Sequence, residues 1–220
     1  GHTVLPLSPA QDYKRVFDGD EGPNTGGMGA YSPLPWLPEG FVDEVIDTVA
    51  IPTVRQLASE RTPFIGLLYC GLIVTPKGVK VIVFFTGTAT TETQVVLPRL
   101  KTPLSQLLFA AASGELASQP RPEFSDDVAV TVVLASEGYP EEPVTGRPIT
   151  GLSDVHDVTI AHAATALVDG TYVATGGRVL SVVATGRTFS EARARVYLAL
   201  DAIHLEGGHY RRDIGLRVSE

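Results

Sequence analysis

Two short segments near the start of the chain combine residue types that could bind a substrate. In the first, Asp12 and Lys14 stand two positions apart within residues 11–15. If that segment is extended, both side chains point to the same side of the backbone. They would then offer a carboxylate for an amine and a cation for a phosphate. The alternative is a solvated ion pair in a surface loop, and the residue types alone leave both interpretations open.

The second segment, residues 22–31, is rich in glycine. Gly26, Gly27 and Gly29 free the backbone for positive φ angles and for close approach to a ligand. Successive N–H groups after Asn24 and Thr25 could form a concave anion-binding site. The competing interpretation is a turn-rich surface loop without a ligand.

Both segments lie in an irregular stretch, residues 8–38, that is rich in Gly, Pro, Asp and Asn. A loop of about thirty residues inside a compact protein is uncommon and is typical of a functional loop. Apolar periodicity and turn residues predict the elements around it. They are a strand at 3–7, a helix at 41–60 with a kink or break at Pro52, a hairpin of 65–74 with 79–85, helices at 94–100 and 103–112, strands at 128–135, 158–163 and 178–184, a hairpin turn at Asp169-Gly170, and a final helix from the capping residues Thr188 and Glu191 to about 204.

This order of elements predicts an α+β fold. The polar, proline-containing residues 118–122 predict a boundary between two domains, 1–117 and 118–220. The net charge of −8, from 17 basic and 25 acidic residues, argues against nucleic acid or an anionic membrane as the principal partner. No apolar run approaches the length of a membrane span and no signal peptide opens the chain, so we expect a cytoplasmic protein.

Five motifs in order along the chain resemble glycinamide ribonucleotide synthetase, the phosphoribosylamine–glycine ligase family. They are Gln11-Asp12-x-Lys14-Arg15, Asn24-Thr25-Gly26-Gly27-Met28-Gly29-Ala30-Tyr31, Gly66-Leu67-Leu68-Tyr69-x-Gly71-Leu72, Gly176-Gly177-Arg178-Val179-Leu180 and Arg212-Asp213-Ile214-Gly215. The resemblance implies the carboxyl half of an ATP-grasp domain followed by a small α+β domain. It also implies an ATP-dependent ligase of purine biosynthesis that joins two small-molecule substrates, glycine and 5-phosphoribosylamine, through glycyl phosphate.

The resemblance assigns roles to individual residues. It implies that Asp12 and Lys14 are catalytic, and that the substrates are bound by Asn24, Thr25, Gly26, Gly27 and Gly29. It implies that Leu72 and Glu92 lie on the nucleotide side, although a plain core leucine is an equal alternative for Leu72. His162 falls in a family His-Ala-Gly-Thr segment, and we expect a structural histidine there.

The chain departs from the family in two ways. It starts as if within a larger protein, with its sole methionine at Met28, so we expect the amino-terminal half of the same enzyme as a partner. The family's metal segment, Glu-Phe-Asn-x-Arg-Phe-Gly-Asp-Pro-Glu-Thr-Gln, reads Val-Phe-Phe-Thr-Gly-Thr-Ala-Thr-Thr-Glu-Thr-Gln at residues 83–94. Val83 and Phe85 therefore replace the Glu and Asn that bind magnesium or manganese, while Gly87 and Thr90 replace the Arg and Asp.

Magnesium needs oxygen ligands, and neither Val83 nor Phe85 supplies one. ATP remains the expected cofactor, but no metal ligand is expected in this chain beyond weak binding by Glu92 through water. Three explanations stay open: a homologue that binds a ligand or partner without turnover, an engineered or truncated chain, or a local sequencing or frame error across residues 83–91.

Overall fold

The computed structural model describes residues 2–220 and mixes helices with antiparallel sheets, which confirms the α+β class. The chain divides into two compact units, each built from separate stretches of sequence. The hairpin unit contains the residues up to Pro9, Pro35–Ala89 and Leu100–Ser125. The sheet unit contains Ala10–Leu34, Thr90–Arg99 and Asp126–Glu220.

The predicted long helix of the hairpin unit is present as three consecutive pieces. Helix α1 (Phe41–Val45) runs through a π-helical turn, Ile46–Ala50, into α2 (Ile51–Ser59). Pro52 lies in the first turn of α2. Since proline cannot donate the hydrogen bond of a regular α-helical turn, the wider turn directly before it is the irregularity that Pro52 predicts.

The predicted hairpin is also confirmed. Strands β5 (Leu68–Thr75) and β6 (Gly78–Thr86) pair in antiparallel register around a tight turn. Most of the side chains of β6 are exposed, including those of Ile82, Val83, Phe84 and Phe85. Tyr69 stacks on Phe85 with ring centroids 4.2 Å apart. Beyond the hairpin, α4 (Leu104–Ser113) ends at Gly114 in the left-handed conformation, as predicted.

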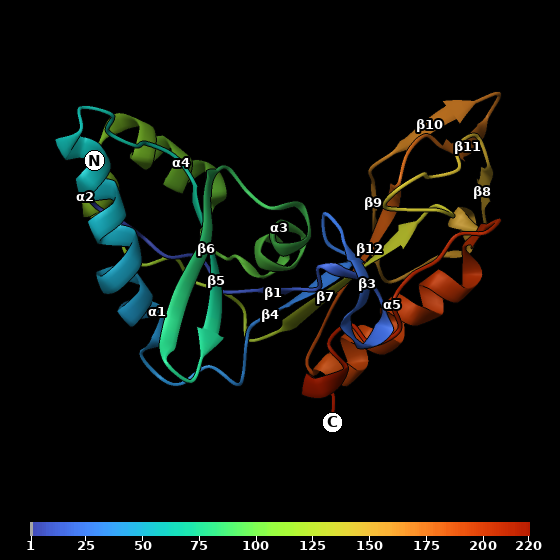
Figure 1. Cartoon of the computed structure of the whole chain (residues 1–220), viewed down its shortest axis with the longest axis horizontal. Helices are drawn as coiled ribbons and strands as arrows, with labels where there is room; N and C mark the ends of the chain where they lie inside the picture. Colours follow the sequence, from blue (N-terminus) through green and yellow to red (C-terminus); the bar gives the residue numbers. More distant parts are fainter. Residues whose placement is uncertain (1) are drawn as a thin grey trace. The chain divides into compact units, whose positions relative to one another are not determined.

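The sheet unit is organised around a five-stranded antiparallel sheet (Figure 1). Its strands, in spatial order, are β1 (Gln11–Asp12), β4 (Gly29–Ser32), β7 (Val128–Ala135), β12 (Arg178–Gly186) and β9 (Thr159–His162). All eight residues of the central strand β7 are buried. That burial explains why its sequence is an apolar run rather than an alternation of apolar and polar residues.

Alternate residues of β7 point to opposite faces of the sheet, and one helix covers each face. Val130 and Val132 pack in one cluster with residues of α5 (Phe189–Ala202). Ala129 packs in another cluster with Val95 of α3 (Thr90–Val96). The face of the sheet that α3 covers carries the candidate site.

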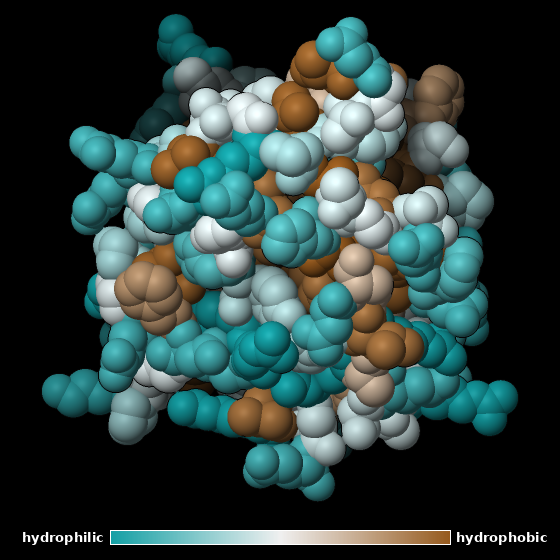
Figure 2. Space-filling model, turned by 90° about the vertical axis from the view of Figure 1, so that its right-hand side faces the viewer, coloured by the Kyte–Doolittle hydropathy of each residue, from teal (hydrophilic) through white to brown (hydrophobic). Residues whose placement is uncertain are grey.

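Smaller sheets complete the unit. Strands β10 (Thr165–Val168) and β11 (Thr171–Ala174) form the hairpin predicted at Asp169-Gly170, where both residues have positive φ. They continue into β8 (Pro148–Thr150) and β13 (His204–Leu205), while β2 (Arg15–Phe17) pairs with β3 (Glu21–Asn24). On the face shown in Figure 2, hydrophobic side chains are interspersed among hydrophilic ones.

Several expectations about elements were wrong. Residues 3–7 form no strand, because Pro6 lacks an N–H and no neighbouring strand pairs with this segment. Helix α3 begins at Thr90 rather than at 94. The stretch 8–38 is not all loop, since it contains β1 to β4. Within residues 2–220, no helix combines the length and the apolar character that crossing a membrane requires.

Candidate active site

Strand pairing sets the position of Asp12. In the antiparallel pair of β1 and β4, Asp12 lies opposite Ala30. Directly opposed residues share one face of a sheet. Ala30 packs with Val95 of α3, so Asp12 also points toward α3.

The first residues of α3 bring a hydroxyl and a second carboxylate to Asp12. Thr91 Oγ1 lies 2.9 Å from Asp12 Oδ1 and 2.8 Å from Glu92 Oε2. The Lys14 ammonium forms an ion pair with Asp12 Oδ2, which confirms that Asp12 and Lys14 point to one side. The Asp12 side chain is 6% exposed, whereas that of Lys14 is 51% exposed. We call Asp12, Thr91 and Glu92 the acidic cluster.

The acidic cluster brings two carboxylates to one hydroxyl. The Thr91 hydroxyl carries one proton, so it can donate to Asp12 or to Glu92 but not to both. Burial and the nearby charge of Glu92 raise the pKa of Asp12, and the contacts with Lys14 and Thr91 only partly oppose that effect. The cluster is therefore suited to a group that supplies N–H donors or positive charge, such as an amine.

A glycine turn, Thr25 to Gly27, lies against the acidic cluster. Both the backbone N–H and the hydroxyl of Thr25 donate to the Lys14 carbonyl, at 2.7 and 2.9 Å. Gly27 donates its N–H to Thr25 Oγ1 at 3.0 Å and has a φ of +108°. A Cβ on Gly27 would lie 2.7 Å from Asp12 Oδ1, so only glycine fits here without displacing the carboxylate.

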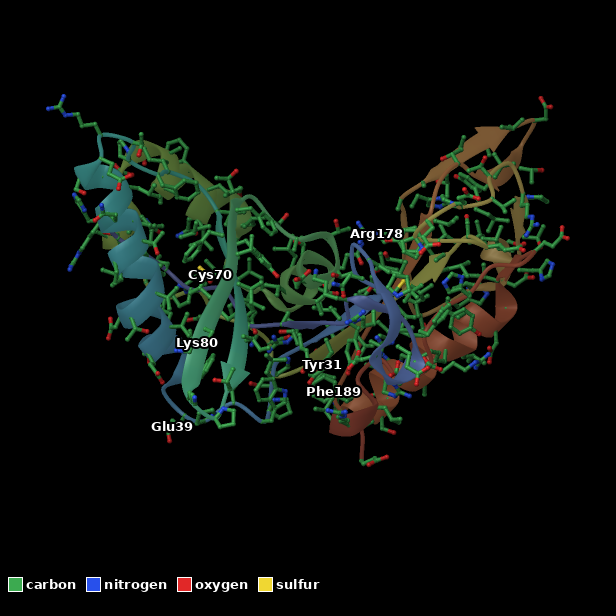
Figure 3. All side chains as sticks on the ribbon, in the orientation of Figure 1. Tyr31, Glu39, Cys70, Lys80, Arg178 and Phe189 are labelled. Atoms are coloured by element: carbon green, nitrogen blue, oxygen red, sulfur yellow. The ribbon has the colours of Figure 1, made fainter. Side chains whose placement is uncertain are left out.

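Both peptide groups of Gly26 are bound by side chains from much later in the sequence. Its N–H donates to the Tyr139 hydroxyl at 3.1 Å, and its carbonyl accepts from Arg178 Nη1 at 2.6 Å. Figure 3 shows Arg178 at the tip of the loop between β3 and β4. Gly177 permits this arrangement, because a Cβ there would lie 2.1 Å from the Tyr139 ring.

The remaining predicted residues lie outside the acidic cluster. Asn24 is exposed at the end of β3, opposite Arg15. Gly29 is buried in β4, where a Cβ would lie 2.6 Å from the Thr131 carbonyl oxygen, so strand packing already requires a glycine there. Leu72 lies half-buried in β5 of the hairpin unit.

His162 has structural contacts, as the sequence predicts. Its ring lies 4.5 Å from that of Tyr172, and its Nδ1 is 2.9 Å from Thr165 Oγ1. Thr165 and Tyr172 belong to β10 and β11 of the four-stranded sheet, so His162 packs the edge strand β9 of the five-stranded sheet against it.

The residues at the family's metal positions do not fit a magnesium ion. Val83 and Phe85 lie in β6 and carry no oxygen ligand on their side chains. Within residues 2–220, no group of three His, Cys, Asp or Glu side chains could hold a metal. We derive no reaction step through a metal.

A buried arginine ties the end of the sheet unit to its beginning. Arg211 is 1% exposed and donates to both carboxylate oxygens of Asp213 and to Asp20. Its guanidinium also lies 4.7 Å from the ring centroid of Tyr13, the residue between Asp12 and Lys14. Burial alone would lower the pKa of Arg211, but its bonds to Asp213 and Asp20 raise it instead.

Sequence reasoning missed Thr91, Tyr139 and Arg211 and gave Arg178 no role. Thr91 stands where the family pattern has proline, so the pattern offered no signal for it. Arg178 directly follows two glycines in one of the five family motifs, and that position could have identified it as a candidate site residue. Tyr139 and Arg211 reach the site only through tertiary contacts.

Comparison with known proteins identifies the family. Residues 1–93 match the model of the phosphoribosylglycinamide synthetase ATP-grasp (A) domain, and residues 129–217 match that of its C domain. Phosphoribosylamine–glycine ligase of Leifsonia xyli subsp. xyli is 70% identical over 99% of this chain, and that of Streptomyces coelicolor is 53% identical over all of it. The alignments cover 53% and 54% of those proteins, so the chain spans about half the length of the curated relatives it matches.

The fold agrees with this match. A solved structure of phosphoribosylamine–glycine ligase from Thermotoga maritima is 33% identical, with a TM-score of 0.86 over 97% of this chain and 53% of that one. These relatives carry the name of a ligase, which does not favour the alternative of a homologue without catalytic activity. The chain belongs to the phosphoribosylglycinamide synthetase family.

Proposed function

We propose that this chain contributes the amine-binding end of an ATP-dependent ligase that joins glycine to 5-phosphoribosylamine. The names of its relatives support the reaction, and the acidic cluster is the observation that carries the assignment of the site. The nucleotide would be held with the help of the amino-terminal half of the family's chain. Leu72 remains the proposed contact to the nucleotide, and Glu92, the other expected nucleotide-side residue, acts with Asp12.

The proposed reaction has two steps. The carboxylate of glycine attacks the γ-phosphorus of ATP, and ADP leaves, which gives glycyl phosphate. The amine of 5-phosphoribosylamine then attacks the acyl carbon of glycyl phosphate. The C–N bond forms, the C–O bond to phosphate breaks, phosphate leaves with the electron pair, and the amine loses a proton.

The acidic cluster is assigned to the second step. An amine that enters the cluster offers N–H donors and positive charge to the two carboxylates, Asp12 and Glu92, that meet at Thr91. Asp12 accepts the proton that the amine loses. Its raised pKa suits this role, since a general base works best when its pKa lies nearer to the working pH. Lys14 balances one of the two negative charges.

The glycine turn holds the amine in contact with Asp12. Gly27 lies so near the carboxylate that a Cβ there would be 2.7 Å from Asp12 Oδ1, and the Asp12 side chain is 6% exposed, so little water reaches it. Exclusion of water protects an acyl phosphate from hydrolysis and strengthens the hydrogen bonds that orient the nucleophile.

The test is an assay of ADP release by this chain co-expressed with the amino-terminal half of the Leifsonia xyli relative. The amine is formed in the assay from ribose 5-phosphate and ammonia, with loss of water. We expect ADP release that requires both glycine and the amine. A verified complex that releases no ADP above background contradicts the proposal.

One substitution tests the assigned base. Asp12→Asn removes the proton acceptor and keeps the size of the side chain, so turnover should fall by about 100-fold or more. Glu21→Gln is the matched control, because Glu21 is exposed in β3 of the same unit. Equal losses in the two variants would rule out a specific role for Asp12.

A further inference from the structure

The peptide groups of Gly26 are flanked by two side chains with unused hydrogen-bond donors. The Arg178 guanidinium has five N–H donors, of which one bonds to the Gly26 carbonyl. The Tyr139 hydroxyl accepts from the Gly26 N–H, and its own proton is not used in any hydrogen bond recorded among residues 2–220. Arg178 also forms no ion pair with a carboxylate in that part of the chain.

Both side chains are held in place by their surroundings. The Tyr139 ring packs against the cluster of Val16, Met28 and Ala135 and lies directly over Gly177. Arg178 begins the strand β12, and its guanidinium is so near Gly26 that a Cβ there would lie 2.9 Å from Cζ. Arg178 and Tyr139 are each half-buried, so their polar ends are fixed but accessible.

The charges on the two sides of the glycine turn are opposite. Arg178 contacts Gly26, while Asp12 contacts the next residue, Gly27. Adjacent Cα atoms are about 3.8 Å apart. The turn therefore lies between a cationic group and an acidic cluster, an arrangement that suits a ligand with an anion at one end and an amine at the other.

We infer that Arg178 and Tyr139 bind the phosphate group of 5-phosphoribosylamine while its amine lies at Asp12. An arginine fork matches the geometry of phosphate oxygens, and a phenol supplies one further donor. This inference rests on the proposed function for the identity of the sugar phosphate. The anion site itself rests only on the contacts around Gly26.

Titration calorimetry of the 220-residue chain with ribose 5-phosphate tests the inference, with ribose as the probe that lacks the phosphate. Arg178→Gln removes the charge but keeps an amide that can donate to Gly26. We expect it to weaken ribose 5-phosphate binding by about 10- to 100-fold, the loss typical of a hydrogen bond to a charged group. Tyr139→Phe should weaken binding by about two- to tenfold and leave the ring packing intact.

Arg187→Gln is the matched control, since Arg187 is exposed in the same unit and its side chain forms no hydrogen bond or ion pair with residues 2–220. It should bind ribose 5-phosphate as the parent does. A parent chain that does not bind ribose 5-phosphate, or an Arg178→Gln variant that binds it unchanged, overturns the inference.

The ligase assay separates this outcome from failure of the proposed function. If the co-expressed halves release ADP but Arg178→Gln keeps its affinity for ribose 5-phosphate, the reaction stands and the phosphate binds elsewhere. If Arg178 governs binding but no ADP is released, the anion site stands and the proposed reaction falls.

Discussion

Thr91 links the two carboxylates of the acidic cluster. Its hydroxyl touches both Asp12 and Glu92 and can donate its one proton to only one of them at a time. The raised pKa of Asp12 follows first from its burial and then from the charge of Glu92. A ligand amine would bring N–H donors and positive charge to Asp12, which offsets both the burial and the charge of Glu92. Without such a ligand the cluster lowers the free energy of unfolding, and binding of the amine restores it.

Asp12→Asn should therefore stabilise the chain near neutral pH. Because the pKa of Asp12 is raised in the folded state, the folded chain binds that proton more readily than the unfolded chain does. The contribution of the Asp12 carboxyl to the free energy of unfolding therefore falls as the pH rises from the ordinary carboxyl pKa through the raised pKa of Asp12. Denaturant titrations between pH 4 and pH 8 should show that the free energy of unfolding of Asp12→Asn exceeds that of the parent by an amount that grows with pH. An Asp12→Asn chain that is less stable than its parent at pH 7 contradicts this account.

Arg211 and Arg212 are neighbours with different roles. The side chain of Arg211 is 1% exposed between Asp213 and Asp20, while that of Arg212 is 64% exposed and lies 3.6 Å from Asp201. Arg211→Met should lower the free energy of unfolding by about 3 kcal/mol, near the lower end for a broken buried ion pair, because Asp20 is itself exposed. Arg212→Met should change it by less than about 1 kcal/mol. Urea denaturation measures both.

The same network predicts sensitivity to acid. Burial alone would raise the pKa of Asp213, but hydrogen bonds from Arg211 and the Gly19 N–H outweigh it and lower the pKa. The stability from this carboxylate is present above its ordinary pKa and is lost as the pH falls through the lowered value. As the pH falls, the free energy of unfolding of the parent should decrease more steeply than that of Arg211→Met. If the two chains show parallel pH profiles, Asp213 is not the group involved.

At the scale of elements, β6 carries Val83 and Phe85, the two residues expected to replace metal ligands. Residues 83 and 85 share one face of the strand, the spacing that two metal ligands on a strand require. Val83→Glu with Phe85→Asn puts a carboxylate and an amide oxygen there. We expect this double variant to bind manganese weakly, at millimolar concentration, as measured by the loss of the free-ion signal in electron paramagnetic resonance.

The matched control makes the same chemical changes at neighbouring positions of β6. Ile82→Glu with Phe84→Asn should not bind manganese, since Ile82 has no paired residue in β5 and this irregularity interrupts the alternation of faces between residues 82 and 84. Equal binding by both double variants would show that added charge alone attracts the ion.

Elements with strong local signals could be predicted from the sequence. The uninterrupted apolar run of β7 is the signal of a buried strand. The helix from Phe189 to Ala202 opens with a capping residue, since Glu191 N–H donates to Thr188 Oγ1. Strands β1 and β4 could not be predicted. They are two and four residues long, and they exist because β7 offers an edge from far along the chain.

The candidate site was predictable only in part, for the same reason. Asp12, Lys14 and the glycine turn are close in sequence, so their types and spacing indicated a shared site. Thr91, Tyr139 and Arg178 join them through pairings that span at least 79 residues. No local pattern encodes such contacts.

At the scale of the whole molecule, the compact units differ from the two contiguous domains expected, 1–117 and 118–220, and that boundary remains a prediction. The difference arises because β1, β4 and α3 pack with strands from the second half of the chain. Residues 118–220 alone would lack β4 and α3, and the α3 side of β7 would be exposed to water.

A fragment of residues 118–220 should therefore unfold without a cooperative transition. Exposure of buried valines and alanines of β7 removes the apolar burial that a unit of this size needs. Thermal unfolding followed by near-ultraviolet circular dichroism measures this, with the 220-residue chain as the control. A fragment with a sharp transition at the temperature of the intact chain would support the contiguous boundary instead.

The position of β7 between β4 and β12 also governs the order of events during synthesis. The ribosome releases Gly29–Ser32 long before it releases Val128–Ala135, and Arg178–Gly186 comes later still. At roughly 5–20 residues per second, the early strands wait about 5 to 20 seconds for the central strand. Asp12 and the glycine turn thus emerge as an unpaired nascent segment, and chaperones that shield nascent chains have their longest opportunity to bind there.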